Sequence, residues 1–209
     1  MRVRHFPLTD YQSIFDKMLS HTEETTQSSE NEIWCVEHPP VFTQGRHGKK
    51  EHLLNAKDIP VVQSDRGGQI TYHGPGQAVI YFMFDLKSLN LGIKDLVCLI
   101  EKSTLALLNH YQIDSHLIDG APGIYVQNKK IASLGLRVKK FKTYHGLAIN
   151  TNMDLTPFSY INPCGYKDME MTQICDFNPN ISLQQVFQDY INIFKSQLEK
   201  SSDQLSCSL

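Results

Sequence analysis

The sequence of 209 residues has no long apolar run, little net charge and no paired cysteine motif. No segment approaches the about 18 consecutive apolar residues that a membrane-spanning helix needs. The formal net charge is -2, so no overall field favours nucleic acid or a membrane surface as a partner. The first residues, MRVRHFPLTDYQS, lack the apolar core of a signal peptide. We therefore expect a cytoplasmic protein.

The cysteines are odd in number and scattered, which argues against a disulfide framework. We expect them to be reduced thiols: Cys35, Cys98, Cys164, Cys175 and Cys207. Cys35 stands three residues before His38, but a structural zinc site needs four ligands in paired local clusters. The other histidines are dispersed, so we expect no metal ion.

Composition is that of an ordinary soluble globular protein, with 41% hydrophobic and 20% charged residues. The length suits one domain with a sizeable core. We find no internal repeat or low-complexity block. We expect a single domain over residues 1–200 and a frayed tail over residues 201–209.

Short strands outnumber helices in the hydrophobic pattern. Helices are predicted from Leu8 to about Glu30, from about Ile93 to Gln112, and from Ser182 onward, where Ser182 and Gln185 have capping-box spacing. Several strands are joined by hairpin-like links, which favours an α+β fold with a mixed, largely antiparallel sheet and flanking helices. The predicted strands are IWCVEHPPVF, which Pro39 and Pro40 stop, and IPVVQSD, AVIYFMFDL, GIYVQ, KIASLGLRV and YHGLAIN.

The stretch DRGGQITYHGPGQ, from Asp65 to Gln77, contains four glycines. It does not match the phosphate-binding pattern G-x-x-x-x-G-K-[ST], and it does not open a helix, whose N-terminus such sites use. Two readings remain. The glycines allow the backbone to approach a ligand, with Arg66, Tyr72 and His73 as contacts, or they only supply positive φ in a long hairpin loop.

Cys164 lies in the irregular stretch YINPCGYKD, between Pro163 and Gly165, whereas Cys98 lies in an apolar periodic pattern. A loop cysteine is a candidate nucleophile, but a free thiol has a pKa of about 8.5 and needs a nearby cation or base. The candidates are Lys129, Lys130, Lys167, His73 and His145. A packing role for Cys164 stays open on this ground alone.

The most basic stretch is RVKKFKTYH, from Arg137 to His145. It is either a solvated hairpin end or a docking surface for an acidic partner, and its composition does not separate the two.

Taken together, these segments resemble the lipoyl(octanoyl) transferases, which load octanoyl groups onto lipoyl domains. The resemblance runs in order through most of the chain, from about Leu8 to the last helix, and no functional block departs from the family pattern. The matching blocks are EHPPVFTQGRHG, DRGGQITYHGPGQAVIYFMFDL, GAPGIYV, KIASLGLRV, YHGLAINTNMDL and INPCGYKDMEMTQI.

The resemblance implies a fold related to the catalytic domains of biotin and lipoate protein ligases. It implies that Cys164 is the nucleophile, which takes octanoyl from the thioester of acyl carrier protein and holds it as an acyl-enzyme. The lysine of the KIASLG block falls on Lys130, which would favour the thiolate and act as general acid and base. Because a thioester becomes an amide, no ATP and no cofactor are expected.

The same resemblance implies which residues contact the acyl chain. They lie in the glycine loop and in two later blocks: Arg66, Gly67, Gly68, Gln69, Ile70, Thr71, Tyr72, His73, Ser133, Leu134, Gly135, Gly146, Leu147 and Ala148. His73 and His145 would lie close to the chemistry as supporting residues.

The implied partners are octanoyl-acyl carrier protein as donor, and lipoyl domains of 2-oxoacid dehydrogenase complexes and the glycine cleavage H protein as acceptors. Such carriers are usually acidic, which gives the stretch from Arg137 to His145 a docking role. We expect a monomer. Three rivals remain: an ATP-dependent lipoate or biotin ligase, an amidotransferase between lipoyl-bearing proteins, and a catalytically silent module that binds carrier proteins.

Overall fold

A computed structural model describes residues 1–24, 30–166 and 169–206. A seven-stranded sheet runs in the order β1-β2-β6-β10-β9-β8-β7. β1 pairs in parallel with β2, and the other neighbours are antiparallel. The predicted α+β class with a mixed, largely antiparallel sheet is confirmed. The strands are β1 (Arg2–Leu8), β2 (Glu32–Glu37), β6 (Gln77–Met83), β7 (His116–Ile118), β8 (Ala121–Val126), β9 (Lys129–Lys139) and β10 (Lys142–Asn150).

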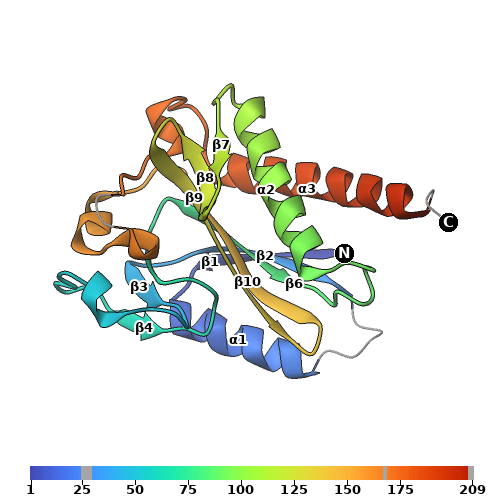
Figure 1. Ribbon diagram of the computed structural model, residues 1–209, viewed down its shortest axis with the longest axis horizontal. Coiled ribbons are helices and arrows are strands. Elements are labelled where there is room, and N and C mark those ends of the chain that lie inside the picture. The colour runs from blue at the N-terminus through green and yellow to red at the C-terminus, as the bar shows by residue number, and fades with distance from the viewer. Residues whose placement is uncertain (25–29, 167–168, 207–209) are drawn as a thin grey trace.

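A smaller sheet has the order β4-β3-β5 and lies beside one end of the large sheet (Figure 1). It consists of β3 (Val41–Gln44), β4 (Val61–Gln63) and β5 (Ile70–His73). The predicted stop within IWCVEHPPVF is confirmed, because β2 ends before Pro39 and Pro40, and the residues after them begin β3 in the smaller sheet. Pro39 and Pro40 lack the N–H groups that a continuous ladder requires, so the chain leaves one sheet there and enters the other.

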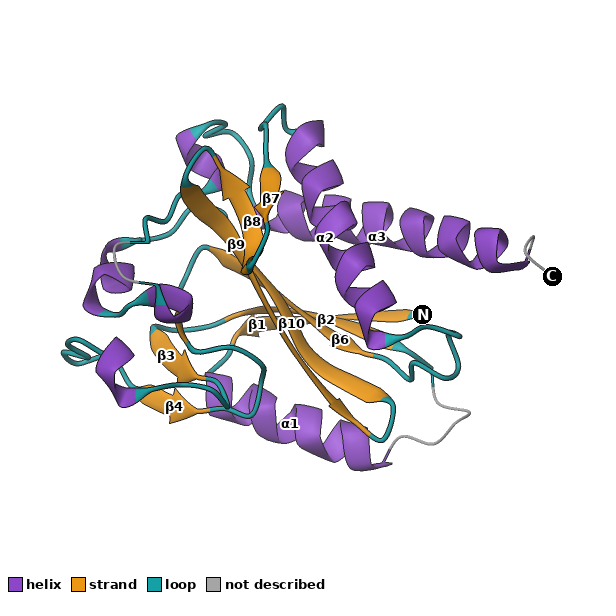
Figure 2. Cartoon of the chain, viewed as in Figure 1, coloured by secondary structure: helices purple, strands orange, loops and turns teal. Residues whose placement is uncertain are grey.

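Three α-helices cover the two faces of the large sheet (Figure 2). α1 (Tyr11–Glu24) packs on one face, and α2 (Ile93–His110) and α3 (Leu183–Ser206) pack on the other. The predicted first helix was placed too early, because the chain up to Leu8 forms β1 beside β2. Asp10 caps α1 by accepting a hydrogen bond from the Ser13 N–H at 3.0 Å.

The predicted start of the last helix is confirmed. The Ser182 hydroxyl accepts a hydrogen bond from the Gln185 N–H at 3.2 Å, immediately before α3. α3 extends to Ser206, over the first six residues of the predicted tail, and Cys207 to Leu209 lie outside the described residues. Within the described ranges, no helix is both long enough and apolar enough to span a membrane.

The described residues also contain four short 3₁₀ turns: η1 (Lys50–His52), η2 (Thr156–Tyr160), η3 (Pro163–Gly165) and η4 (Ile174–Asp176). η2 and the smaller sheet share a third apolar cluster, which contains Phe42, Ile70 and Phe158. This packing places the segment that contains η3 beside the smaller sheet.

Candidate functional site

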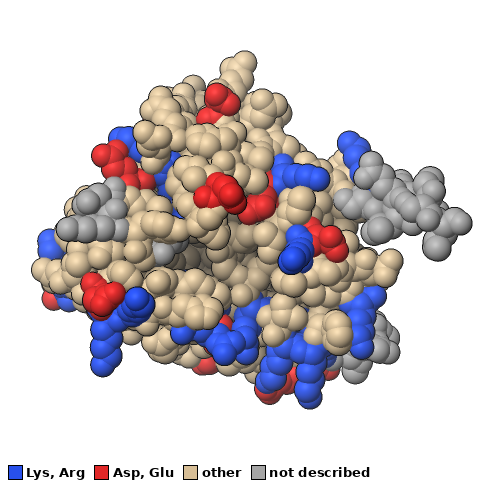
Figure 3. Space-filling view, in the orientation of Figure 1, with Lys and Arg blue, Asp and Glu red and all other residues tan. Residues whose placement is uncertain are grey.

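A cavity lies on the α1 side of the large sheet, where neighbouring strands carry small side chains. Ser133 of β9 is opposite Ala148 of β10, and Gly135 is opposite Gly146. These four residues leave a trough in the sheet surface. The surface is hollowed at its centre (Figure 3). The cavity is lined by Tyr11, Arg66, Gly68, Gln69, Thr71, His73, Val79, Tyr81, Ser133, Leu134, Gly135, His145, Gly146, Leu147 and Ala148.

The glycine loop lies across this trough. The Gly67 N–H donates to the Leu136 carbonyl at 3.0 Å, and a Cβ on Gly135 would lie 3.0 Å from the Gly67 carbonyl oxygen. Gly68 has a φ of +83°, a conformation that favours glycine. The loop therefore contains a residue that needs positive φ, and it also approaches a neighbouring backbone closely.

Within this stretch the structure contains a strand that the sequence reading treated as loop. β5 continues the alternation of its side chains, so Thr71 and His73 line the cavity, whereas Ile70 and Tyr72 pack in the cluster around Phe42. The alternating pattern of β-branched and aromatic residues in ITYH was the signal for this strand.

Most of the expected acyl contacts therefore meet at one cavity, and a few do not. Gly67 lines a neighbouring groove, and Ile70 and Tyr72 face away from the cavity. Sequence reasoning did not include Tyr11, Val79 and Tyr81 among the lining residues. Val79 and Tyr81 alternate along β6 and lie opposite Ala148 and Gly146 of β10, so strand alternation carried that signal.

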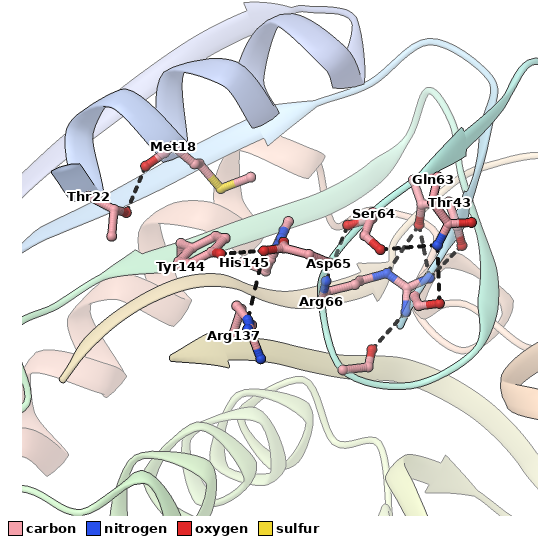
Figure 4. A network of polar contacts seen from close by, with 12 residues as sticks. Met18, Thr22, Thr43, Gln63, Ser64, Asp65, Arg66, Arg137, Tyr144 and His145 are labelled. Atoms are coloured by element: carbon pink, nitrogen blue, oxygen red, sulfur yellow. Dashed lines mark hydrogen bonds and ion pairs between the residues drawn. The ribbon is translucent and has the colours of Figure 1, made fainter. Parts of the chain in front are cut away.

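A chain of hydrogen bonds fixes Arg66 and His73 in the cavity wall. Arg66 donates from Nε to the Thr43 hydroxyl at 3.2 Å (Figure 4), and that hydroxyl is 3.4 Å from His73 Nε2. His73 Nδ1 donates to Gln77 Oε1 at 2.7 Å, and Gln77 Nε2 donates to Asn150 Oδ1 at 2.9 Å. Burial lowers the pKa of His73 to about 3, so the ring is neutral.

Lys130 is fully buried, and a β-bulge sets its direction. The β8–β9 register shifts between Ile124 and Tyr125, and Ile131 and Ala132 both belong to the core cluster under α2 and α3. Because the bulge places these two on one side, Lys130 faces the opposite side, which is the side of the cavity. Its ammonium lies 5.3 Å from the centre of the Tyr125 ring.

The surroundings of Lys130 are shaped by a glycine and by the segment that follows η3. A Cβ on Gly123 would lie 2.4 Å from Lys130 Cε and 3.0 Å from Nζ, so only glycine leaves room for this side chain. The Lys130 N–H donates to the Glu170 carbonyl at 2.9 Å, and the Thr172 N–H donates to the Lys130 carbonyl at 3.0 Å. The backbone of Lys130 is thus fastened to the chain shortly after Cys164.

Cys164 lies in η3, and its side chain is outside the part of the chain that the structure describes, as is Lys167. The turn is anchored on both sides. The Asn162 N–H donates to the His52 carbonyl at 2.8 Å, and the Tyr166 hydroxyl donates to the Gly120 carbonyl at 2.7 Å. A Cβ on Gly165 would lie 2.8 Å from Nε2 of Gln69, which lines the cavity. η3 therefore lies next to the cavity.

Two of the other cysteines are poor nucleophiles. Burial raises the pKa of the Cys35 thiol to about 12. Burial also raises the pKa of Cys175, and the Asp176 carboxylate adds to the effect. Less thiolate forms in each case. Cys98 is exposed on α2. No group of three or more His, Cys, Asp or Glu side chains that would hold a metal ion occurs among the described residues.

A polar cluster lies at the opposite end of the trough from Lys130. Asp65 accepts hydrogen bonds from the Tyr144 hydroxyl and from His145 Nε2, the latter at 2.9 Å (Figure 4). Burial lowers the pKa of His145, although the Asp65 carboxylate opposes this shift. Leu136, the cross-strand partner of His145, is six residues beyond Lys130 on β9. The structure thus separates His145 from Lys130.

His73 lies nearer to Lys130. Its partner Gln77 pairs across the sheet with Asn150 of β10, and Ile149 pairs with Ala132 of β9. Both histidines that were expected near the chemistry line the same cavity, His73 from β5 and His145 from β10.

A groove adjoins the cavity and shares Gly68, Leu134 and Gly135 with it. Its apolar wall comes from α2, β7 and β9, and includes Leu117 and Ile118, while Glu101 and Asp119 supply carboxylates. In Figure 3, acidic side chains lie above the hollow and basic side chains gather below it.

The predicted basic stretch forms the β9–β10 hairpin. Lys139 forms an ion pair with Glu23 at 3.1 Å, and Lys142 donates to the Thr22 carbonyl at 3.2 Å. Lys140 is exposed in the turn, with a φ of 51°. Lys139 and Lys140 are therefore the residues of this tip that present charge to solvent, whereas Lys142 is partly engaged with α1.

The chain resembles known proteins over most of its length. A family model for the lipoyl protein ligase A/B catalytic domain matches residues 11–195. The chain is 55% identical over 195 residues to an octanoyltransferase of Francisella tularensis subsp. tularensis, covering 93% of this chain and 95% of that protein. It is 50% identical over 199 residues to an octanoyltransferase of Legionella pneumophila, covering 95% and 100%.

Solved structures share the fold at low identity. A bipartite lipoate protein ligase from Thermoplasma acidophilum matches with a TM-score of 0.75 at 14% identity, covering 95% of this chain and 83% of that one. A biotin protein ligase from Aquifex aeolicus matches with a TM-score of 0.56 at 13% identity, covering 95% and 68%. These matches agree with the expected relation to the ligase catalytic domains.

Proposed function

Because the chain belongs to the octanoyltransferase family of acyltransferases, we propose that it transfers octanoyl from acyl carrier protein to a lysine of lipoyl domains through a thioester on Cys164, without ATP. The acceptors are the lipoyl domains of 2-oxoacid dehydrogenase complexes and the glycine cleavage H protein, and the enzyme acts as a cytoplasmic monomer.

One observation carries this proposal. The backbone of the buried Lys130 is hydrogen-bonded to Glu170 and Thr172, shortly after Cys164, and η3 adjoins the cavity through Gln69. These contacts support a pairing of Lys130 with the η3 segment at one end of a trough with small side chains. The raised pKa values of Cys35 and Cys175 further favour Cys164 as the nucleophile.

The reaction then proceeds in two steps, each of which forms one bond and breaks another. The Cys164 thiolate attacks the thioester carbonyl carbon of the donor, a new C–S bond forms, and the carrier thiol leaves after it receives a proton. The ε-amine of the acceptor lysine next attacks the acyl-cysteine, the amide forms, and Cys164 is released as thiolate. Lys130 is the residue that we assign to proton transfer in both steps.

Carrier docking at the tip of the β9–β10 hairpin is part of the proposal. Lys139 and Lys140 are exposed there, and carrier proteins of this kind are usually acidic. Opposite charges at the rim of an interface speed association rather than adding much affinity.

The test is an intact-mass measurement on the protein mixed with octanoyl-acyl carrier protein in the absence of ATP. We expect one octanoyl adduct, which is lost in Cys164→Ala, persists in Cys98→Ala and disappears when an apo lipoyl domain is added. Octanoyl transfer that survives in Cys164→Ala but requires ATP would establish an adenylate-forming ligase instead.

A further inference from the structure

His145 adopts a backbone conformation that is rare for a residue with a side chain. Its φ is 61° in the middle of β10, and such left-handed residues persist only where their surroundings hold them. Its contacts show on which side of the sheet the His145 ring lies. Tyr144 packs in the cluster under α1, and the His145 ring also lies on this side, 5.3 Å from Phe15 and 6.2 Å from Tyr81. Two successive residues therefore face the cavity side, against the normal alternation.

The sheet is adapted locally to allow this. The Thr143 hydroxyl donates to the Phe82 carbonyl at 2.7 Å and accepts from the Phe84 N–H at 3.2 Å. These two bonds satisfy groups of β6 and of Phe84 just after it, where Tyr144 and His145 have no ladder partner on β6, and regular pairing resumes at Gly146.

Asp65 fixes the ring itself. One carboxylate accepts from the Tyr144 hydroxyl and from His145 Nε2 at 2.9 Å, and it is also 3.8 Å from Nε of Arg137 (Figure 4). Because three groups from β9 and β10 converge on this carboxylate, the imidazole is held in one orientation.

His145 lies about as far from the reacting end of the trough as an eight-carbon acyl chain extends. The Lys130 ammonium lies beside Gly123, which precedes Ile124, the partner of Ala132 on β9. The ammonium is therefore level with Ser133, three residues or about 10 Å along the strand from Leu136, the partner of His145. An eight-carbon chain extends about 10 Å, the length of roughly three strand residues. From the end near Gln69 and η3 it would cover the small pairs Ser133–Ala148 and Gly135–Gly146, and its methyl end would meet His145.

The wall at that end is rigid and polar. The His145 side chain is 1% exposed, and its Nδ1 is a buried atom with no hydrogen-bond partner among the described residues. The neighbouring Tyr81 hydroxyl is engaged with His38 Nε2 at 2.8 Å. A longer chain would have to displace a clamped ring and press methylene groups against polar atoms, which is unfavourable.

We propose that His145, held by Asp65 and Tyr144, is the end stop of the acyl cavity and makes this enzyme select eight-carbon acyl groups over longer ones. The inference rests on the proposed function, which places the thioester at the Lys130 end.

The test compares acyl-carrier-protein donors of six, eight, ten and twelve carbons, with transfer to an apo lipoyl domain as the readout. In His145→Gly, glycine retains the left-handed backbone while the imidazole is removed. We expect the kcat/KM of the twelve-carbon donor relative to the eight-carbon donor to rise at least tenfold. Ala148→Val narrows the trough from β10 and should shift the preference toward the six-carbon donor.

An unchanged chain-length profile in His145→Gly, or an equal loss for all four donors, would overturn the inference. If the glycine variant does not fold, His145→Asn serves in its place, since asparagine tolerates this backbone conformation and is shorter. Its expected result is a higher ratio for the ten-carbon donor, and an unchanged ratio would count against the end stop. Octanoyl loading of the wild-type Cys164 is measured in parallel. Its absence would refute the proposed function, whereas its presence beside an unchanged profile refutes the end stop alone.

Discussion

Acidification should destabilise this protein well before its carboxylates become protonated, because two neutral histidines are buried together. Burial lowers the pKa of His73 to about 3 and that of His38 to about 4. His38 Nδ1 donates to the Thr9 carbonyl at 2.7 Å, and its Nε2 accepts from the Tyr81 hydroxyl. A second proton on either ring would place a charge in a buried site, and the two rings are only 5.9 Å apart.

The sign of the effect follows from proton uptake. In the unfolded chain both rings have a pKa of about 6.5, so below that pH the unfolded state binds more protons and is favoured. Stability is full above about pH 6.5 and falls as the pH approaches the folded pKa values. At pH 5 each ring costs about 2 kcal/mol, so the pair removes about 4 kcal/mol. For a chain of this size the melting temperature would fall by roughly 8–16 °C.

Urea unfolding followed by circular dichroism at pH 7.5 and pH 5 measures this loss. His73→Gln removes one of the two rings, so its loss of unfolding free energy between these pH values should be smaller than that of wild type by about 2 kcal/mol. The matched control is His110→Gln, which changes an exposed ring on α2 and should leave the loss unchanged. Equal losses in wild type and His73→Gln would refute the reasoning.

Two further predictions concern Lys130 and the hairpin tip. Gly123→Ala places a methyl group 2.4 Å from Lys130 Cε and should lower kcat at least tenfold. Gly120→Ala also has a positive φ but meets nothing within 4 Å, so it should cost about 1 kcal/mol of stability and keep most of the activity; equal kcat in the two variants would contradict the role of Gly123. Charge reversal at Lys139 and Lys140 should raise KM for octanoyl-acyl carrier protein and leave a small octanoyl thioester unaffected, and an equal rise for both donors would exclude docking at this tip.

The sequence predicted the fold class because hydrophobic alternation and turn residues act locally. The cap at Ser182 and the break at Pro39 and Pro40 are local signals of this kind. It did not predict β1, because that strand is stabilised by parallel pairing with β2, which lies more than twenty residues later. Pairing between distant segments leaves no local signature.

Most residues that line the cavity could be predicted from the sequence, but the directions in which Lys130 and His145 point could not. Small residues at Ser133, Gly135, Gly146 and Ala148 can be read from the sequence, and alternation alone places them on one face. Strict alternation would also place Lys130 on the opposite face from Ser133. Only the bulge at Ile131 and Ala132 reverses this, and a bulge of this type has no reliable sequence signal.

At the other end of the trough, a left-handed residue instead of a bulge breaks the alternation. His145 reaches the cavity side only because its φ is 61°, and Asp65 holds it there from the first residue of the glycine loop. The glycine loop thus connects the two irregular positions. Asp65 fixes His145 at the far end, and Gln69 meets η3 at the near end. The length of chain between Asp65 and Gln69, together with the positive φ of Gly68, therefore sets the distance between the reacting end and the closed end of the cavity. A change in that loop should alter chain-length preference even where no residue that touches the acyl group is replaced.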